Sequence, residues 1–525
     1  MQGALAAPQR GGNAIDAAIA TAFAQGVADP QMSSVGGNGV LQVYHAPSGE
    51  HLVLEFYGRA PLKATPDLFA SRVKGYLRFG LWELEGRVNQ VGHLSVTTPG
   101  TVLGLWELHR RFGTLPWDAL LQPAIALARD GFPVPGELHA LWVREPYIPG
   151  TASTLEVLNA TPASRRLFTR DGAAIRPGEV FRNPDYARTL ERIAREGPDV
   201  LYKGDIAHQI AEDFARNGGL LSYEDLATYR VRVKQPVRGT YRGYEVAGVP
   251  APGSGLQIVE TLNILEGFNV GALGFPSADY LDLLARAQLA GFADRMRYLG
   301  DPEFAEVPEA MLASKEHARG WQERIRRGEP IQVGAPQPEP AHTTTVSAMD
   351  EEGNAVAITH TLGTPASGVV VEGLGFMFNN SMHSFHPYPG HPNSIAPGKA
   401  RTTGMSPTIV FRDGRPCIVT SAPGATKILT ANLQVIVNLV DHGMTAVEAV
   451  AAPRLHAESW VDLEARLAYA FGAELERRGH RVVKSTYSYD PFFGLAHAVV
   501  RDPATGRLVP AADPRGRGGT AVWRG

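Results

Sequence analysis

Cysteine is nearly absent from this chain of 525 residues, which contains only Cys417. A single cysteine excludes an intrachain disulfide and any zinc or iron–sulfur site built from several cysteines. No apolar run approaches the roughly 18–20 residues that a membrane-spanning helix needs, so we expect no membrane span. Charge of one sign is not in excess either, with 50 Lys and Arg against 53 Asp and Glu. This balance argues against a nucleic-acid partner, and 44% hydrophobic residues indicate an ordinary globular protein.

The first residues lack the basic and then apolar pattern of an export signal. The sequence therefore leaves the compartment open. We expect a cytoplasmic protein if the start is genuine, and a periplasmic or secreted one if the N-terminus is truncated.

The first two thirds of the chain predict mainly helices. Asn13 is a good N-cap for a helix in which Ile15, Ile19 and Phe23 share one face. Two strands, 40–45 and 51–56, are expected to form a hairpin. Further helices are predicted at 102–111, 117–129, 187–195, 205–216, 223–229, 256–265 and 280–298, and a strand at 246–249.

The last third of the chain is different in kind. A polar, proline-rich stretch, 327–340, has the composition of an exposed linker. Beyond it, strands are predicted at 343–349, 355–361, 408–412, 416–421, 481–485, 496–501 and 507–510. Helices are predicted at 425–441, from 445 onward and at 464–478, the second with a capping box of Thr445 and Glu448.

Three threonines, Thr343 to Thr345, follow the linker directly. Such a run is typical of a strand start, because β-branched side chains favour strands. The alternative is that Thr343 is a nucleophile released by self-cleavage after His342. A hydroxyl needs a base to attack, and a threonine at a chain start can use its own α-amine.

The expected hairpin brings a second hydroxyl group close to Thr343. If the turn at 350–354 is symmetrical about Glu352, Thr361 lies opposite Thr343, where its hydroxyl can bond to the nucleophile. Farther along, Gly424 and Ala425 stand where a strand is expected to end and a helix to begin. They are either an ordinary turn or amide donors for an oxyanion, since a helix N-terminus favours negative charge.

Other motifs are weaker. His383, His386 and His391 lie in a proline-punctuated loop without cysteine or acidic ligands nearby, so we expect no metal. The stretch 253–255 lacks the spacing of a serine nucleophile elbow. The stretch 36–39 lacks the spacing of a dinucleotide fingerprint, so we expect no cofactor.

Ordered motifs along nearly the whole chain resemble the γ-glutamyltransferase (glutathione hydrolase) family. They are GGNAIDAA (11–18), SVGGNG (34–39), PGTV (99–102), QPA (122–124), ARDG (128–131), FADR (292–295), TTxxS (343–347), GNAV (353–356), MSPT (405–408) and AAPR (451–454). The resemblance implies an α+β fold of the Ntn-hydrolase type, a four-layer αββα sandwich with two antiparallel sheets between helical layers. It also implies self-cleavage between His342 and Thr343 into a large chain, 1–342, and a small chain, 343–525, which form one intertwined heterodimer.

The resemblance also implies residue roles. Thr343 is the nucleophile, Thr361 its hydroxyl partner, and the amides of Gly424 and Ala425 form the oxyanion hole. The substrate-binding positions of the family fall on residues that depart from its pattern. Tyr57 stands where the family has the arginine for the substrate α-carboxylate, and Arg59 is a nearby substitute. The other substrate-binding positions of the family fall on Gly363, Ser381, Ser384, Thr403 and Gly404.

The sequence thus predicts a self-processing amide hydrolase or acyltransferase that acts on a small-molecule amide, with γ-glutamyl groups of glutathione-like donors as the first hypothesis. A second is an amide lacking an amino-acid head, as in oxamate-type amidohydrolases or acylases. A third is a catalytically silent relative that acts as a binding or scaffold protein.

Overall fold

Two antiparallel sheets form the centre of the molecule in the computed structural model, which describes residues 5–77, 81–146, 148–334, 343–363 and 365–523. One sheet has the order β12-β13-β1-β2-β9 and the other the order β10-β11-β14-β15-β19-β20. The first consists of β1 (Asn38–His45), β2 (Glu50–Phe56), β9 (Arg232–Lys234), β12 (Thr344–Met349) and β13 (Ala355–Thr361). The second consists of β10 (Val237–Tyr241), β11 (Tyr244–Gly248), β14 (Thr408–Arg412), β15 (Arg415–Ser421), β19 (His497–Arg501) and β20 (Leu508–Ala512).

The two sheets pack face to face through small and branched side chains, including Ala247, Ala357 and Val419. A buried amide also joins them, because Gln42 Nε2 donates to the carbonyls of Ala247 at 3.1 Å and Pro407 at 3.0 Å. Short side chains at this interface let the strands of both sheets approach closely.

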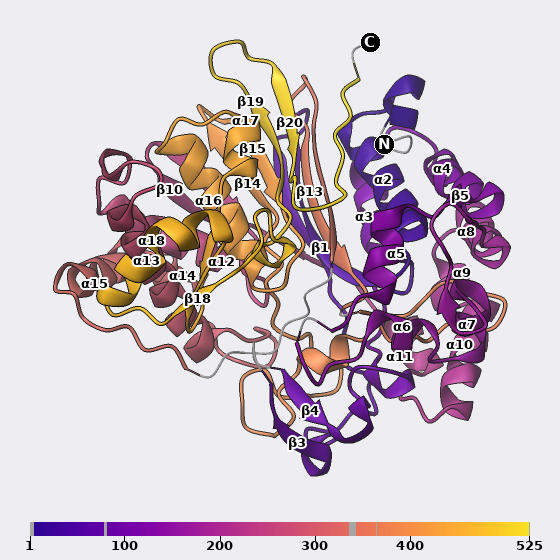
Figure 1. Ribbon diagram of the computed structural model, residues 1–525. Helices are drawn as coiled ribbons and strands as arrows, with labels where there is room; N and C mark the ends of the chain where they lie inside the picture. The colour runs from indigo at the N-terminus through magenta and orange to yellow at the C-terminus, as the bar shows by residue number, and fades with distance from the viewer. Residues whose placement is uncertain (1–4, 78–80, 147, 335–342, 364, 524–525) are drawn as a thin grey trace.

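Helices cover the outer faces of both sheets (Figure 1). The first sheet is covered by α2 (Ala14–Ala28) and α3 (Thr101–Phe112), with α4 (Trp117–Asp130) and α8 (Pro184–Glu196) outside them. The second is covered by α12 (Gly255–Glu266) and α16 (Lys427–Val440), with α13 (Ala278–Tyr298) and α15 (Lys315–Arg326) packed on α12. The predicted four-layer αββα sandwich is therefore confirmed.

Shorter elements surround these layers. The helices are α5 (Gly136–Val143), α6 (Thr154–Leu158), α7 (Pro162–Phe168), α9 (Asp199–Tyr202), α10 (Asp205–Arg216), α11 (Tyr223–Thr228), α14 (Glu309–Leu312), α17 (Ala446–Ala451) and α18 (Ala465–Arg477). The strands are β3 (Val73–Tyr76), β4 (Trp82–Leu84), β5 (Phe132–Pro133), β6 (Thr169–Arg170), β7 (Ala173–Ala174), β8 (Val180–Phe181), β16 (Leu455–Ala457), β17 (Val461–Leu463) and β18 (Val482–Lys484).

Local signals in the sequence correctly located several element ends. Asn13 caps α2, because its Oδ1 accepts from the amides of Ile15 and Asp16 at 2.9 and 3.0 Å. The capping box of Thr445 and Glu448 opens α17. Strand β13 begins and ends as predicted.

The predicted start of the helix at Ala425 is wrong. Ala425 has φ 60° and Gly424 has φ 137°, so neither is helical, and α16 begins at Lys427. A left-handed backbone at a non-glycine residue is unfavourable and needs support from its surroundings. The turn at 424–425 is therefore a specific structure and not the first turn of the helix.

The predicted linker is observed in part. Residues 327–334 follow α15 without forming a helix or strand. The rest of the linker, 335–342, lies outside the described residues, as does His342. In the described part of the chain, no helix is both long enough and apolar enough to cross a membrane.

Candidate active site

Thr343 and Thr361 face each other at one end of the β12–β13 hairpin. Thr344 pairs with His360 and Met349 with Ala355, which is the register predicted for a symmetrical turn. The Thr343 hydroxyl donates to Thr361 Oγ1 at 3.3 Å, and the two residues are 5% and 0% exposed. The hairpin thus brings two hydroxyl groups together in a buried position.

A backbone amide holds the Thr361 hydroxyl in place. The N–H of Gly363 donates to Thr361 Oγ1 at 2.9 Å. Gly363 has φ 98°, and a side chain there would collide with Asn380 Oδ1. Glycine is therefore required at this position, both for the backbone conformation and for space.

The turn after β15 presents backbone amides near β12. Ser421 ends β15, and its Oγ bonds to the hydroxyls of Thr345 and Ser347, so the end of β15 lies against β12. In the described part of the chain, the N–H groups of Gly424 and Ala425 donate to no protein acceptor. Two amides of the turn that precedes α16 are therefore available for a negatively charged oxygen.

Tyr57 and Arg59 follow β2. Tyr57 is 3% exposed, and its carbonyl accepts from Tyr229 Oη at 2.7 Å. Arg59 Nη1 lies 3.5 Å from Asp301 Oδ2 and 3.3 Å from Glu303 Oε2. The Arg59 guanidinium is thus already engaged with two carboxylates of its own chain.

Ser381 and Ser384 lie on a short 3₁₀ helix, Ser381–Ser384, beside the threonine pair. Asn38 Nδ2 donates to Ser381 Oγ at 2.9 Å, and Asn38 also pairs with Thr361 in the sheet. Ser384 Oγ lies 3.4 Å from His383 Nε2. The fold therefore places both serines near Thr361, without a carboxylate among these contacts.

Thr403 and Gly404 precede β14 in an extended, buried segment. The Thr403 amide donates to the Pro252 carbonyl at 3.0 Å, and its carbonyl accepts from Ser254 Oγ at 2.7 Å. Asn393 connects this segment to the serines, because it donates to the carbonyl of Ser384 and accepts from the amide of Thr402.

Asn38 was not predicted as a site residue, although the motif that contains it was recognised. Its role depends on a sheet pairing with Thr361 and on a contact with Ser381, both more than 300 residues away in sequence. No local pattern indicates such a contact.

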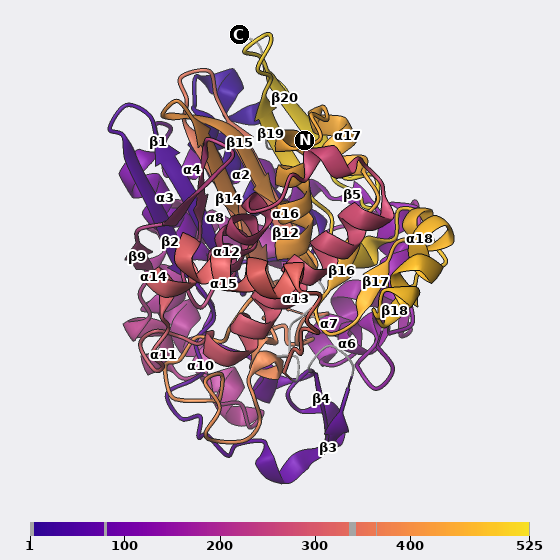
Figure 2. The same cartoon turned by 90° about the vertical axis from the view of Figure 1, so that its left-hand side faces the viewer.

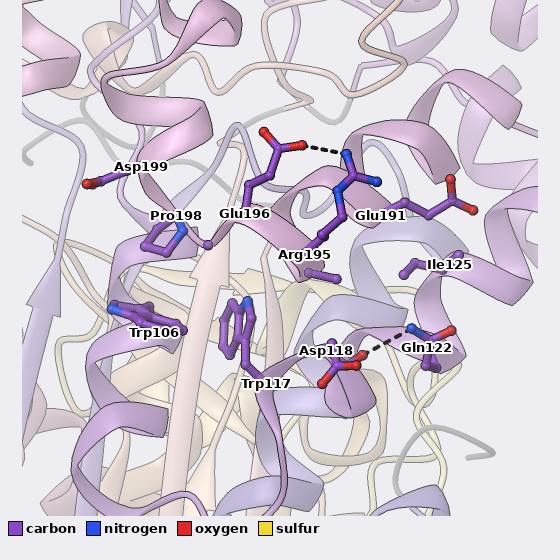
Figure 3. A pocket seen from close by; sticks show the side chains of 12 residues that line it. Trp106, Trp117, Asp118, Gln122, Ile125, Glu191, Arg195, Glu196, Pro198 and Asp199 are labelled. Atoms are coloured by element: carbon purple, nitrogen blue, oxygen red, sulfur yellow. Dashed lines mark hydrogen bonds and ion pairs between the residues drawn. The ribbon is translucent and has the colours of Figure 1, made fainter.

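A surface pocket of about 790 Å³ lies elsewhere, on α3, α4 and α8 (Figure 3). Trp106 and Trp117 line it, with ring centroids 5.0 Å apart, together with Asp118 and Glu191. None of its lining residues belongs to the threonine site. Among the residues that the structure describes, its lining includes no serine, threonine or cysteine.

Two buried histidines make the stability of the fold pH-dependent. Burial lowers the pKa of His360 to about 3 and that of His383 to about 4, the latter helped by the Arg401 guanidinium. Both are therefore neutral in the folded chain near neutral pH, whereas in the unfolded chain they become protonated below about pH 6.5. Folding stability is full above that pH and is lost as the pH falls toward the lowered values.

We expect each histidine to remove about 2 kcal/mol of unfolding free energy between pH 7 and pH 5. Urea unfolding of the uncleaved Thr343→Ala chain at both pH values measures the loss. Adding His360→Gln should shrink the difference between the two pH values by about that amount. An unchanged difference would contradict the assignment of His360 as a neutral buried group.

Comparisons with known proteins show which family the chain resembles. The family model described as Gamma-glutamyltranspeptidase matches residues 4–523. A glutathione hydrolase proenzyme from Escherichia coli (strain K12) is 36% identical, over 97% of this chain and 87% of its own length. An acylase ACY 1 proenzyme from Pseudomonas sp. (strain SE83) is 40% identical, over 90% of this chain and 84% of its own length.

Two solved structures of similar proteins also align with this chain. The crystal structure of a cephalosporin acylase from Bacillus halodurans aligns with a TM-score of 0.86 and 31% identity, covering 100% of this chain and 94% of that chain. A γ-glutamyltranspeptidase from Pseudomonas nitroreducens complexed with L-DON aligns with a TM-score of 0.54 and 33% identity, covering 61% of this chain and 90% of that chain.

Proposed function

Because the chain belongs to the γ-glutamyltranspeptidase family of Ntn hydrolases, we propose that Thr343 is the nucleophile of its self-processing amide hydrolase and acyltransferase chemistry. The hydroxyl contact between Thr343 and Thr361 carries this assignment, together with the amide that Gly363 donates to Thr361. These contacts orient a hydroxyl pair at the first residue of the segment that follows the linker.

Self-cleavage begins when Thr343 Oγ attacks the carbonyl carbon of His342. The peptide C–N bond breaks as the ester C–O bond forms, and water then hydrolyses the ester. The products are a large chain, 1–342, with a new carboxylate and a small chain, 343–525, with a free α-amine on Thr343. The two chains stay together as a heterodimer, since each sheet contains strands from both.

Turnover uses the same residues. The freed α-amine takes the proton of the Thr343 hydroxyl as the hydroxyl attacks the substrate amide. The amides of Gly424 and Ala425 donate to the oxyanion that forms. The C–N bond breaks as the α-ammonium group returns the proton to the leaving amine. Water or an acceptor amine, losing a proton to the α-amine, then takes the acyl group and releases the Thr343 hydroxyl. The chemistry requires no cofactor.

We propose γ-glutamyl groups of glutathione-like compounds as one donor class and expect weak activity toward them. An amino-acid head carries a carboxylate and an ammonium group, yet Tyr57 replaces a guanidinium and Arg59 is paired with Asp301 and Glu303. Loss of one partner of a buried charge pair costs ~2–5 kcal/mol. That corresponds to roughly 30-fold to several-thousand-fold in affinity.

A second donor class is an acyl amide without the amino-acid head, as for an acylase. The charges around Ser384 favour this second donor class. Ser381 and Ser384 supply no negative charge, and the Arg401 guanidinium lies close enough to lower the pKa of His383. A cation there repels the ammonium group of a γ-glutamyl donor.

The specificity test compares kcat/KM for a γ-glutamyl anilide and a simple acyl anilide in wild type, Tyr57→Arg and Arg59→Ala. We expect wild type to have the higher kcat/KM for the simple acyl anilide. We expect Tyr57→Arg to have a higher kcat/KM than wild type for the γ-glutamyl anilide. Tyr57→Phe is the matched control, since it removes the hydroxyl without adding charge. Efficient wild-type turnover of the γ-glutamyl anilide that Arg59→Ala abolishes would show that Arg59 binds the carboxylate.

The same screen tests the third hypothesis, a catalytically silent binding or scaffold protein. Complete self-cleavage without turnover of either anilide would favour it, because cleavage needs the Thr343 hydroxyl but no substrate pocket.

A further inference from the structure

Three metal-capable side chains converge on helices that precede the linker. Glu260 on α12, Asp294 on α13 and His317 on α15 each offer one ligand atom, and these atoms all lie within 4.8 Å of one another. Helices α12, α13 and α15 lie side by side on the outer layer over the second sheet (Figure 2). Within the described residues, no other group of His, Cys, Asp and Glu side chains meets this condition.

Only one of the two carboxyl groups lies within close hydrogen-bond distance of the histidine. His317 Nε2 lies 2.6 Å from Asp294 Oδ2 but 3.6 Å from Glu260 Oε1. In the described part of the chain, Glu260 Oε1 is buried without a hydrogen-bond partner, and Glu260 is 2% exposed. A buried carboxyl oxygen that faces an imidazole and a second carboxyl group, and that makes no close hydrogen bond of its own, is suited to a cation.

We propose that Glu260, Asp294 and His317 bind one divalent transition-metal ion, for which Zn²⁺ is the probe. Two carboxylates and a neutral imidazole balance the charge of such an ion, and this ligand set suits zinc. Tetrahedral ligands about 2.0–2.1 Å from zinc lie about 3.4 Å apart. The site therefore needs only small side-chain shifts from the spacing observed here.

The surroundings support a structural role for the ion. Trp321 Nε1 donates to Asp294 Oδ2 at 2.7 Å, which fixes the carboxylate from outside the ligand group. His317 is a partly exposed ligand, with 21% of its side chain accessible, so an ion can enter from the surface. Helix α15 is the last element before the linker and the cleavage position. An ion here ties the end of the large chain to α12 and α13.

The test measures Zn²⁺ binding by the full-length, processed protein after chelator treatment and dialysis, with metal quantified by mass spectrometry. We expect one tightly bound Zn²⁺ per processed molecule and a higher Tm with Zn²⁺ than without it. His317→Ala and Glu260→Gln should each weaken binding by at least about 100-fold, since loss of an outer-shell partner alone costs 10–100-fold. Neither should show the Tm increase.

The matched control is His480→Ala. His480 Nε2 lies 2.6 Å from Asp282 Oδ1, also on α13, where Arg286 already pairs with the carboxylate. This variant should bind Zn²⁺ like wild type. Absence of stoichiometric Zn²⁺ binding by wild type, or equal binding by His317→Ala, would overturn the proposal. If His317→Ala does not fold, Glu260→Gln decides between the two outcomes. No readout here depends on enzymatic activity.

Discussion

Thr343→Ala is expected to remain one uncleaved chain and to have no amide hydrolase activity. The substitution removes the oxygen that attacks the carbonyl of His342 and the oxygen that forms the acyl-enzyme. The β12–β13 pairing is retained, because it begins at Thr344. Denaturing electrophoresis and intact mass measure cleavage, and anilide hydrolysis measures turnover.

Thr343→Ser is the matched control for this prediction. Serine keeps the hydroxyl and loses only a methyl group, so the chain should still cleave at the same bond. Spontaneous cleavage of Thr343→Ala between His342 and residue 343 would refute the nucleophile assignment. Normal turnover by an uncleaved Thr343→Ala chain would refute it as well.

Removing the Ala425 amide is expected to have the second largest effect. Proline is a poor probe, because its φ near −65° is incompatible with the φ of 60° at Ala425. Replacing Ala425 by the corresponding α-hydroxy acid removes only the N–H and keeps the side chain and φ. Loss of one oxyanion donor typically lowers kcat by ~10²–10³, and we expect a decrease of that size with KM little changed.

Ala425→Gly serves as the control for position 425. It keeps the N–H and relieves the backbone strain of a non-glycine residue with positive φ. Its kcat should stay within a few-fold of wild type. An unchanged kcat in the ester variant, measured on the fully cleaved fraction, would remove this amide from the oxyanion hole.

Local sequence patterns predicted the parts of the site that depend on short-range geometry. The pairing of Thr343 with Thr361 follows from the turn at 350–354, where the Asp350 amide donates to the Asn354 carbonyl at 3.1 Å. A slip of one residue would turn every side chain of the strand to the other face, so the buried pattern allowed one register. The starts of α2 and α17 were also predictable, because a capping residue and the first turn of its helix are neighbours in the sequence.

Other features depend on contacts distant in sequence or on a weak local signal. The ion pairs of Arg59 with Asp301 and Glu303 join residues more than 240 positions apart. Helix α15 was not predicted, because charged residues dominate it and its buried face is limited to Ala318, Trp321, Gln322 and Ile325. Tertiary packing on α12 and α13 therefore stabilises a helix whose buried stripe is narrow and lies among many charged residues.

Mass spectrometry of the acylated enzyme tests the central claim most directly. Processed protein is mixed with a slowly hydrolysed acyl donor, quenched in acid, and the small chain is fragmented. We expect a small chain that begins at Thr343 and carries one acyl group, located on the side chain of Thr343. An acyl group on any other residue, or a small chain with a different first residue, would contradict that claim.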